Sequence, residues 1–137
     1  MKPYFSYSAC ALATAAALVF TGCASVPATP EQAVQNRAEQ YWQARIAGDY
    51  HKAYDLTPPS YRKVRTLEQF HMQYGGPAMV QFAQVVRVRC QTAQKCTALM
   101  KIGGKPPLPG LKMGTIATHV DEAWVMEDGQ WWRYQAP

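Results

Sequence analysis

The chain has 137 residues, enough for one ordinary domain but not for two independent cores. Its composition, with 48% hydrophobic and 17% charged residues, excludes an intrinsically disordered protein, because this many hydrophobic residues can form a packed core. Fourteen basic and nine acidic residues give a formal net charge of +5, a mild excess without a long basic run that does not predict nucleic-acid binding.

The first twenty-three residues have the pattern of a secretion signal. Lys2 supplies a positive charge, and residues 9–20 form an apolar run of twelve, shorter than the about 20 residues that span a bilayer. The run leads into Val-Phe-Thr-Gly-Cys at 19–23, a segment that resembles a bacterial lipobox, although the family usually carries Leu, Val or Ile in place of Phe20. The resemblance implies that residues 1–22 are a signal peptide and that Cys23 is acylated, with palmitate as a typical acyl chain.

The same resemblance implies a location. Ala24 follows the cysteine, whereas the inner-membrane retention signal of such lipoproteins is usually Asp. We therefore expect an outer-membrane anchor that faces the periplasm, with membrane lipid bound through acylated Cys23. An ordinary cleaved signal peptide and an uncleaved anchor are the alternatives, and both keep the protein outside the cytoplasm. Residues 23–29 would form the lipidated cysteine and a short tether, and residues 30–137 a single domain.

The remaining cysteines predict a disulfide. Cys10 leaves with the signal peptide, so Cys90 and Cys96 remain as a pair in an oxidising compartment. The five residues between them fit a hairpin loop, whose opposed positions come close enough for a bridge. A redox pair usually has two intervening residues, and a metal site would need two further ligands that are not found nearby. We therefore expect neither a metal nor a cofactor.

Helix signals dominate the first half of the predicted domain. Capping boxes are formed by Thr29 with Gln32 and by Thr66 with Gln69. Asp49 caps a further helix directly after Gly48, which ends the first one. These signals predict helical segments at residues 30–47, 50–56, 60–64 and 67–74.

After this point the hydrophobic period changes to alternation, which indicates strands. The predicted inward residues are Val80, Phe82, Val86, Val88 and Cys90 on one strand, and Cys96, Ala98, Met100 and Ile102 on the next. Residues 103–110 are expected to form a loop, because their prolines cannot donate backbone hydrogen bonds. Asp128-Gly129 is a two-residue turn signal that joins strands at 115–126 and 130–135.

Helices followed by antiparallel hairpins define an α+β fold class. The run from Tyr41 to Tyr50, with its Gly-Asp corner, and the aromatic hairpin from Trp124 to Tyr134 resemble a nuclear transport factor two-like domain. The resemblance implies N-terminal helices packed on a strongly curved antiparallel sheet, a cone that often encloses a pocket. That family includes isomerases, dehydratases and cyclases as well as non-catalytic binding and assembly modules, so the fold does not define the function.

The Asp128-Gly129 turn also predicts a register, in which alternate residues share a face. One face carries Val120, Glu122, Trp124, Met126, Trp131 and Arg133, and the other carries His119, Asp121, Ala123, Val125, Trp132 and Tyr134. Alternation leaves open which face is inward. Arg133 is placed to lie over Trp124 and reach Glu122, an arrangement that we interpret as architectural.

Three sets of residues are candidate sites. His119, Asp121 and Tyr134 offer a base, an acid and a donor for proton transfer in a pocket, although ordinary polar groups of a sheet are the alternative. Basic residues at 62, 63 and 65, and at 87, 89 and 101, are either solvated or contact anionic headgroups. Aromatic candidates for ligand or partner binding are Tyr41, Trp42, Tyr54, Trp124 and Trp132.

Together these patterns favour a non-catalytic, membrane-anchored lipoprotein of binding or envelope-assembly type, which holds a protein partner of the envelope or a small apolar ligand. The alternative is a pocket enzyme of the isomerase, dehydratase or cyclase type that works by proton transfer. A homodimer formed through the sheet is a third hypothesis, suggested by the tryptophans on both faces of the last hairpin.

Overall fold

The computed structural model describes residues 28–75, 80–105 and 114–136. Predictions for the signal peptide, for Cys23 and for most of the proline-rich loop lie outside these residues. The helices are α1 (Pro30–Ile46), α2 (Tyr50–Asp55), α3 (Pro59–Arg62) and α4 (Leu67–Tyr74), and the strands are β1 (Phe82–Thr92), β2 (Lys95–Gly104), β3 (Ile116–Glu127) and β4 (Gln130–Arg133). Within the described ranges, no helix is long and apolar enough to cross a membrane.

The starts of α1, α2 and α4 are those that the sequence predicts. The Thr29 side chain accepts a hydrogen bond from the Gln32 amide at 3.2 Å, and the Gln32 side chain accepts one from the Thr29 amide at 3.0 Å. A second capping box of the same kind begins α4. Gly48 has a φ of +76°, a left-handed conformation that glycine adopts without strain, and it turns the chain so that α2 can begin directly after it.

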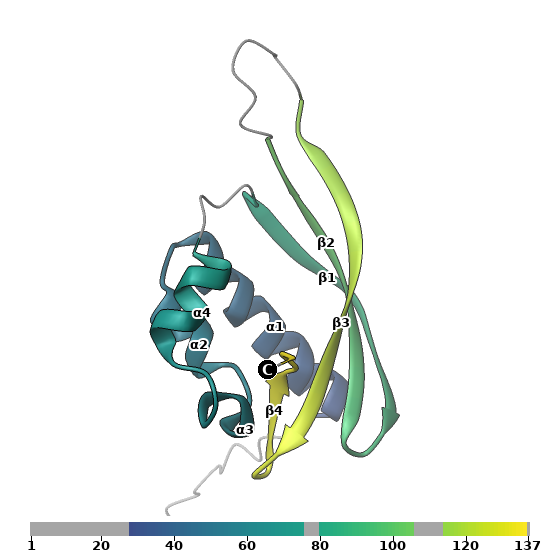
Figure 1. Ribbon diagram of the computed structural model, residues 1–137. Helices are drawn as coiled ribbons and strands as arrows, with labels where there is room; N and C mark the ends of the chain where they lie inside the picture. Colours follow the sequence, from purple (N-terminus) through teal and green to yellow (C-terminus); the bar gives the residue numbers. More distant parts are fainter. Residues whose placement is uncertain (1–27, 76–79, 106–113, 137) are drawn as a thin grey trace, which may run out of the picture.

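The four strands form an antiparallel meander in the order β1-β2-β3-β4. Figure 1 shows the helices on one side of this sheet. The α+β class is therefore confirmed. Within the described residues the sheet does not close, since β1 and β4 stand at opposite edges, and the finer expectation of a strongly curved cone is not confirmed.

The predicted register of the last hairpin is confirmed. Trp124 pairs with Arg133, and the neighbouring pairs follow in step. The turn residues Asp128 and Gly129 have φ values of 51° and 75°, as a two-residue hairpin turn of type I′ requires. Tyr134 continues the alignment by donating its amide to the Ala123 carbonyl at 2.8 Å.

The first strand departs from the predicted alternation. Its register with β2 shifts between Val85 and Arg87, which is the signature of an extra residue in one strand. Val86 was predicted to face inward, but it is 49% exposed. Val85 packs on the core instead, as does Ala83, because a bulge reverses which residues of a strand face each side.

The core lies between the sheet and α1. Trp124 and Met100 are fully buried on the sheet side, and they meet Val34, Ala38 and Tyr41 of the helix. The face that carries Trp124 and Glu122 is therefore the inward one. His119 and Asp121, which alternate with these residues along β3, are exposed.

The predicted disulfide is present. Cys90 and Cys96 pair directly across β1 and β2, and their sulfur atoms are bonded at 1.96 Å. Cys96 is fully buried, so the bridge links the first hairpin at the edge of the core.

Replacing both cysteines with alanine should lower the free energy of unfolding by about 2 kcal/mol, because the seven-residue ring no longer restricts the unfolded chain. Urea unfolding followed by circular dichroism measures the change. The wild-type protein under reducing conditions is the matched control and should show a similar loss. Equal unfolding midpoints for the oxidised and reduced proteins would contradict a stabilising bridge.

Candidate functional site

The structure does not gather the predicted catalytic residues in one pocket. His119 and Asp121 lie on the exposed face of β3, opposite Lys101 and Leu99 of β2. Tyr134 follows β4 and is 51% exposed. The three side chains are exposed to solvent and do not line one enclosed pocket, so the geometry does not support the proton-transfer hypothesis.

The aromatic residues predicted to bind a ligand separate into two groups. Tyr41, Trp42 and Trp124 are buried in the core, where they hold the helix against the sheet. Tyr54 is half-buried and donates its hydroxyl to the Arg65 carbonyl at 2.6 Å. Trp132 is 9% exposed and lies outside the core cluster, beside arginines from two helices.

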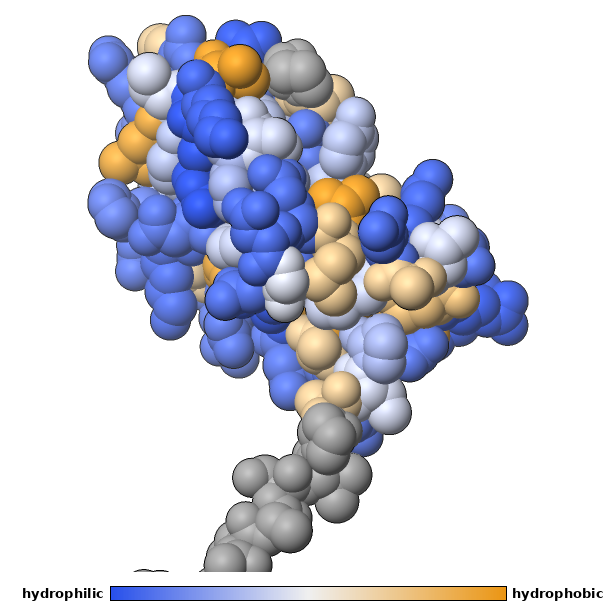
Figure 2. All heavy atoms as spheres, turned by 90° about the horizontal axis from the view of Figure 1, so that it is seen from below, coloured by the Kyte–Doolittle hydropathy of each residue, from blue (hydrophilic) through white to orange (hydrophobic). Residues whose placement is uncertain are grey.

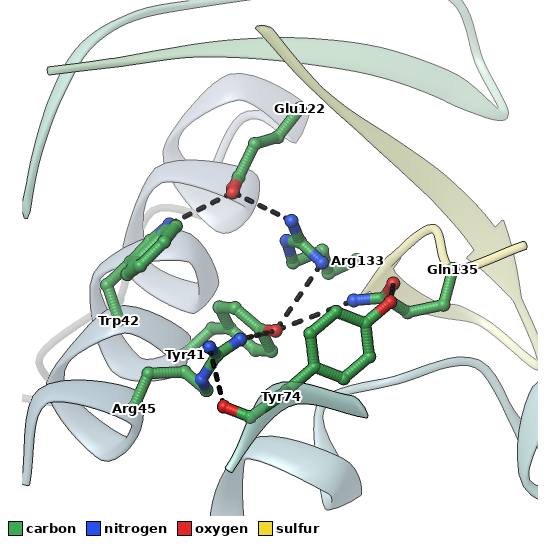
Figure 3. A network of polar contacts seen from close by, with 7 residues as sticks. All are labelled: Tyr41, Trp42, Arg45, Tyr74, Glu122, Arg133 and Gln135. Carbon is green, nitrogen blue, oxygen red and sulfur yellow. Dashed lines mark hydrogen bonds and ion pairs between the residues drawn. The ribbon is translucent and has the colours of Figure 1, made fainter. Parts of the chain in front are cut away.

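A buried carboxylate is the centre of a polar network between α1 and the last hairpin (Figure 3). One oxygen of Glu122 accepts hydrogen bonds from the Trp42 indole at 3.0 Å and from the Arg133 guanidinium at 3.0 Å. The Glu122 side chain is 4% exposed and that of Arg133 is 18% exposed. The sequence predicts the Glu122–Arg133 contact, but it gives no signal for Trp42, which comes from a helix eighty residues away.

The hydroxyl of Tyr41 extends this network. It accepts a hydrogen bond from Arg45 at 2.9 Å and longer ones from Arg133 at 3.4 Å and Gln135 at 3.5 Å. Gln135 in turn accepts a hydrogen bond of 2.7 Å from the hydroxyl of Tyr74. The network thus joins α1, α4, β3, β4 and the segment after β4, and its seven residues converge in Figure 3.

Charge compensation keeps Arg133 ionised. Burial alone lowers the pKa of this guanidinium, but Glu122 and the Tyr41 hydroxyl outweigh burial, so the pKa lies above its ordinary value. Burial also raises the pKa of Tyr74. The hydrogen bonds between these groups join the helix to the last hairpin, and we interpret the network as a structural clamp.

An apolar groove lies between α3 and the last hairpin. It has a volume of about 450 Å³. Two of its residues, Val64 and Tyr134, expose apolar surface to solvent, and Val64 is 64% exposed. Tyr61 and Gln135 are buried. The full lining is Pro58, Ser60, Tyr61, Val64, Val125, Tyr134 and Gln135.

Sequence reasoning missed this groove, because its residues come from segments that no local pattern connects. Two hydrogen bonds join the two sides of the groove: the Glu127 carboxylate accepts one from the Ser60 amide and one from the Ser60 hydroxyl, each at 2.7 Å. They hold the start of α3 against the end of β3. In the described part of the chain, no group of three or more His, Cys, Asp or Glu side chains could hold a metal ion.

The fold and the groove define an α+β domain in which helices cover one face of an open antiparallel sheet. No family model and no curated protein matches the chain. A solved SEC-C motif containing protein from Psychrobacter arcticus is similar in structure, with a TM-score of 0.59 and 12% identity over 79% of this chain. The match spans 62% of that protein's length.

A second solved structure, a SEC-C motif containing protein from Rhodopseudomonas palustris, has a TM-score of 0.51 and 14% identity over 78% of this chain and 76% of its own. At these identities the likenesses show the fold alone. The structural neighbours are thus SEC-C motif containing proteins, and the resemblance to nuclear transport factor two-like domains is wrong. The residues that suggested it, Tyr41, Trp42 and Trp124, are core residues, and such patterns do not distinguish one helix-on-sheet fold from another.

Replacing Arg133 with methionine should lower the free energy of unfolding by about 3 to 5 kcal/mol, because Glu122 would remain buried without its cation. Urea unfolding provides the measurement. Combining Arg133→Met with Glu122→Gln should restore much of the loss, since glutamine keeps an acceptor for Trp42 without the charge. An unchanged midpoint in Arg133→Met would show that the pair does not stabilise the fold.

Proposed function

We propose that this chain is a lipid-anchored binding domain that faces the periplasm and holds a small apolar ligand in the groove between α3 and the last hairpin. The observation that carries the proposal is the groove itself. Its volume of about 450 Å³ lies in the range of about 300–1,000 Å³ that is typical of small-molecule sites.

The chemistry of the lining favours an apolar ligand. Pro58, Val64 and Val125 offer hydrocarbon surface, and Tyr134 adds an aromatic ring. Two of its polar side chains already have partners: Gln135 is bonded to Tyr74, and Ser60 to Glu127. A ligand would therefore gain mainly from removing apolar surface from water.

The anchored location rests on the lipobox-like segment that ends at Cys23. Figure 2 shows the molecule from below, on the side where the described chain begins, and a strip of apolar residues crosses this side between hydrophilic ones. Apolar surface beside the start of the described chain supports the proposal that the domain works close to a membrane. The envelope protein partner and the homodimer stay predictions.

Nile red, a neutral apolar dye, should bind to residues 24–137, which include every residue that the structure describes. Replacing Val64 with aspartate should weaken binding about tenfold, because the loss of one valine contact costs about 1.5 kcal/mol. The dye's fluorescence measures the affinity. Val64 is largely exposed, so the fold should tolerate the change.

Met72→Asp is the matched control. Met72 is 72% exposed and belongs to α4, away from the lining of the groove. This variant should bind the dye as well as the wild type does. Equal weakening by both substitutions, or no binding by the wild type, would count against the groove as the binding site and favour a protein partner.

The anchor has its own test. Cells that express the full chain should incorporate radiolabelled palmitate into the wild type and not into Cys23→Ala, because acylation would need the thiol of that residue. After fractionation, the wild type should be found with outer membranes. Label in the Cys23→Ala protein, or none in the wild type, would exclude acylation at Cys23.

A further inference from the structure

Two arginines from different helices meet at one tryptophan on the side of the last hairpin that faces away from the Glu122 network. The guanidinium carbon of Arg37 in α1 lies 4.4 Å from the centre of the Trp132 ring, and that of Arg62 in α3 lies 5.0 Å from it. The two guanidinium groups are therefore no further apart than the sum of these distances, and both lie against the same indole ring.

Neither arginine has an acidic partner in the part of the chain that the structure describes. The ion pairs there are His51–Asp55 and Glu122–Arg133. The neighbours of Arg37 on α1 at three and four residues' distance are uncharged, and its buried Nε has no hydrogen-bond partner among the described residues. Burial lowers the pKa of Arg37, and the positive charge of Arg62 lowers it further.

The surrounding contacts hold this arrangement in place. Arg62 donates from one nitrogen to the carbonyl oxygens of Asp55 and Thr57, which fixes its side chain beside the end of α2. The Trp132 indole donates to the Glu127 carbonyl at 2.8 Å. The Glu127 carboxylate is engaged by Ser60.

Two like charges held against one ring repel each other, although each is attracted to the face of the indole. An anion between the guanidinium groups would remove the repulsion. Phosphate fits best, because each guanidinium can donate two parallel hydrogen bonds to its oxygens, and a phosphate group carries enough oxygens to serve two arginines.

We propose that Arg37 and Arg62, supported by Trp132, form a binding site for a phosphate group. The site is separate from the apolar groove and does not depend on its function. The phosphate can belong to a lipid headgroup or be free in solution. If Cys23 is acylated, the tether of residues 24–29 reaches about 20 Å at most, so lipid headgroups would lie within the site's neighbourhood.

The test uses the full chain in neutral detergent micelles and phenylglyoxal, a reagent that modifies accessible arginines. Peptide mass spectrometry reads the extent of modification at each arginine. Inorganic phosphate is the first probe. The second is phosphatidic acid mixed into the micelles, compared with the same fraction of diacylglycerol, which lacks the phosphate. We expect protection of Arg37 and Arg62, whereas Arg87 and Arg89 on the outer sheet face should stay reactive.

Variants then test whether the two arginines act together. In Arg37→Gln, protection of Arg62 should need about ten times more of the probe, which corresponds to the loss of one charge-assisted contact. Arg37→Lys keeps the charge without the planar guanidinium, so the amount of probe needed to protect Arg62 should lie between those of the wild type and Arg37→Gln. Arg87→Gln removes the same charge from an exposed strand position and should leave protection of Arg62 unchanged. Circular dichroism confirms that each variant is folded.

The outcomes are distinct. Protection by inorganic phosphate supports a site for free phosphate, and protection by phosphatidic acid alone supports a lipid headgroup. The proposal is overturned if neither probe protects, if the outer-face arginines are protected equally, or if Arg37→Gln and Arg87→Gln have the same effect. Nile red binding should be unchanged in Arg37→Gln, which separates this site from the groove.

Discussion

The need to compensate one buried carboxylate organises the structure. Glu122 lies on the inward face of β3 and is almost completely buried, and an unpaired charge in such a place would be costly. Its partners come from both sides, Trp42 from α1 and Arg133 from β4. The helix and the last strand are therefore fixed relative to β3, and Tyr41 connects the same arginine to the C-terminal segment.

The short strand β4 has a different role on each of its faces. Arg133 points into the clamp, whereas Trp132, one residue earlier, points the opposite way and meets Arg37 and Arg62. The segment directly after the strand contributes Tyr134 and Gln135 to the apolar groove. The buried network thus holds in place the residues that we assign to binding, and Gln135 belongs to both the network and the groove.

Local signals in the sequence predicted the local features well. The capping residues Thr29 and Thr66, the Asp128-Gly129 turn and the cysteine pair each act over a few residues, so short spacings are enough to reveal them. The bulge at Val86 could not be predicted, because an extra residue interrupts an alternation that otherwise looks continuous. The stacking of Arg37 on Trp132 could not be predicted either, because it depends on how distant segments pack. The same is true of the open sheet.

The strand order has a consequence for self-association. The outer edge of β4 is covered in part, because the Arg133 amide donates to the Leu56 carbonyl at 3.2 Å. β1 forms the other edge, and within the described residues no further strand pairs with it. An open edge can template pairing with a second chain, and charged side chains and bulges oppose such pairing. The bulge at Val86 followed by Arg87 and Arg89 gives β1 both features, so the same irregularity that disturbs the core pattern also makes this edge a poor template for aggregation.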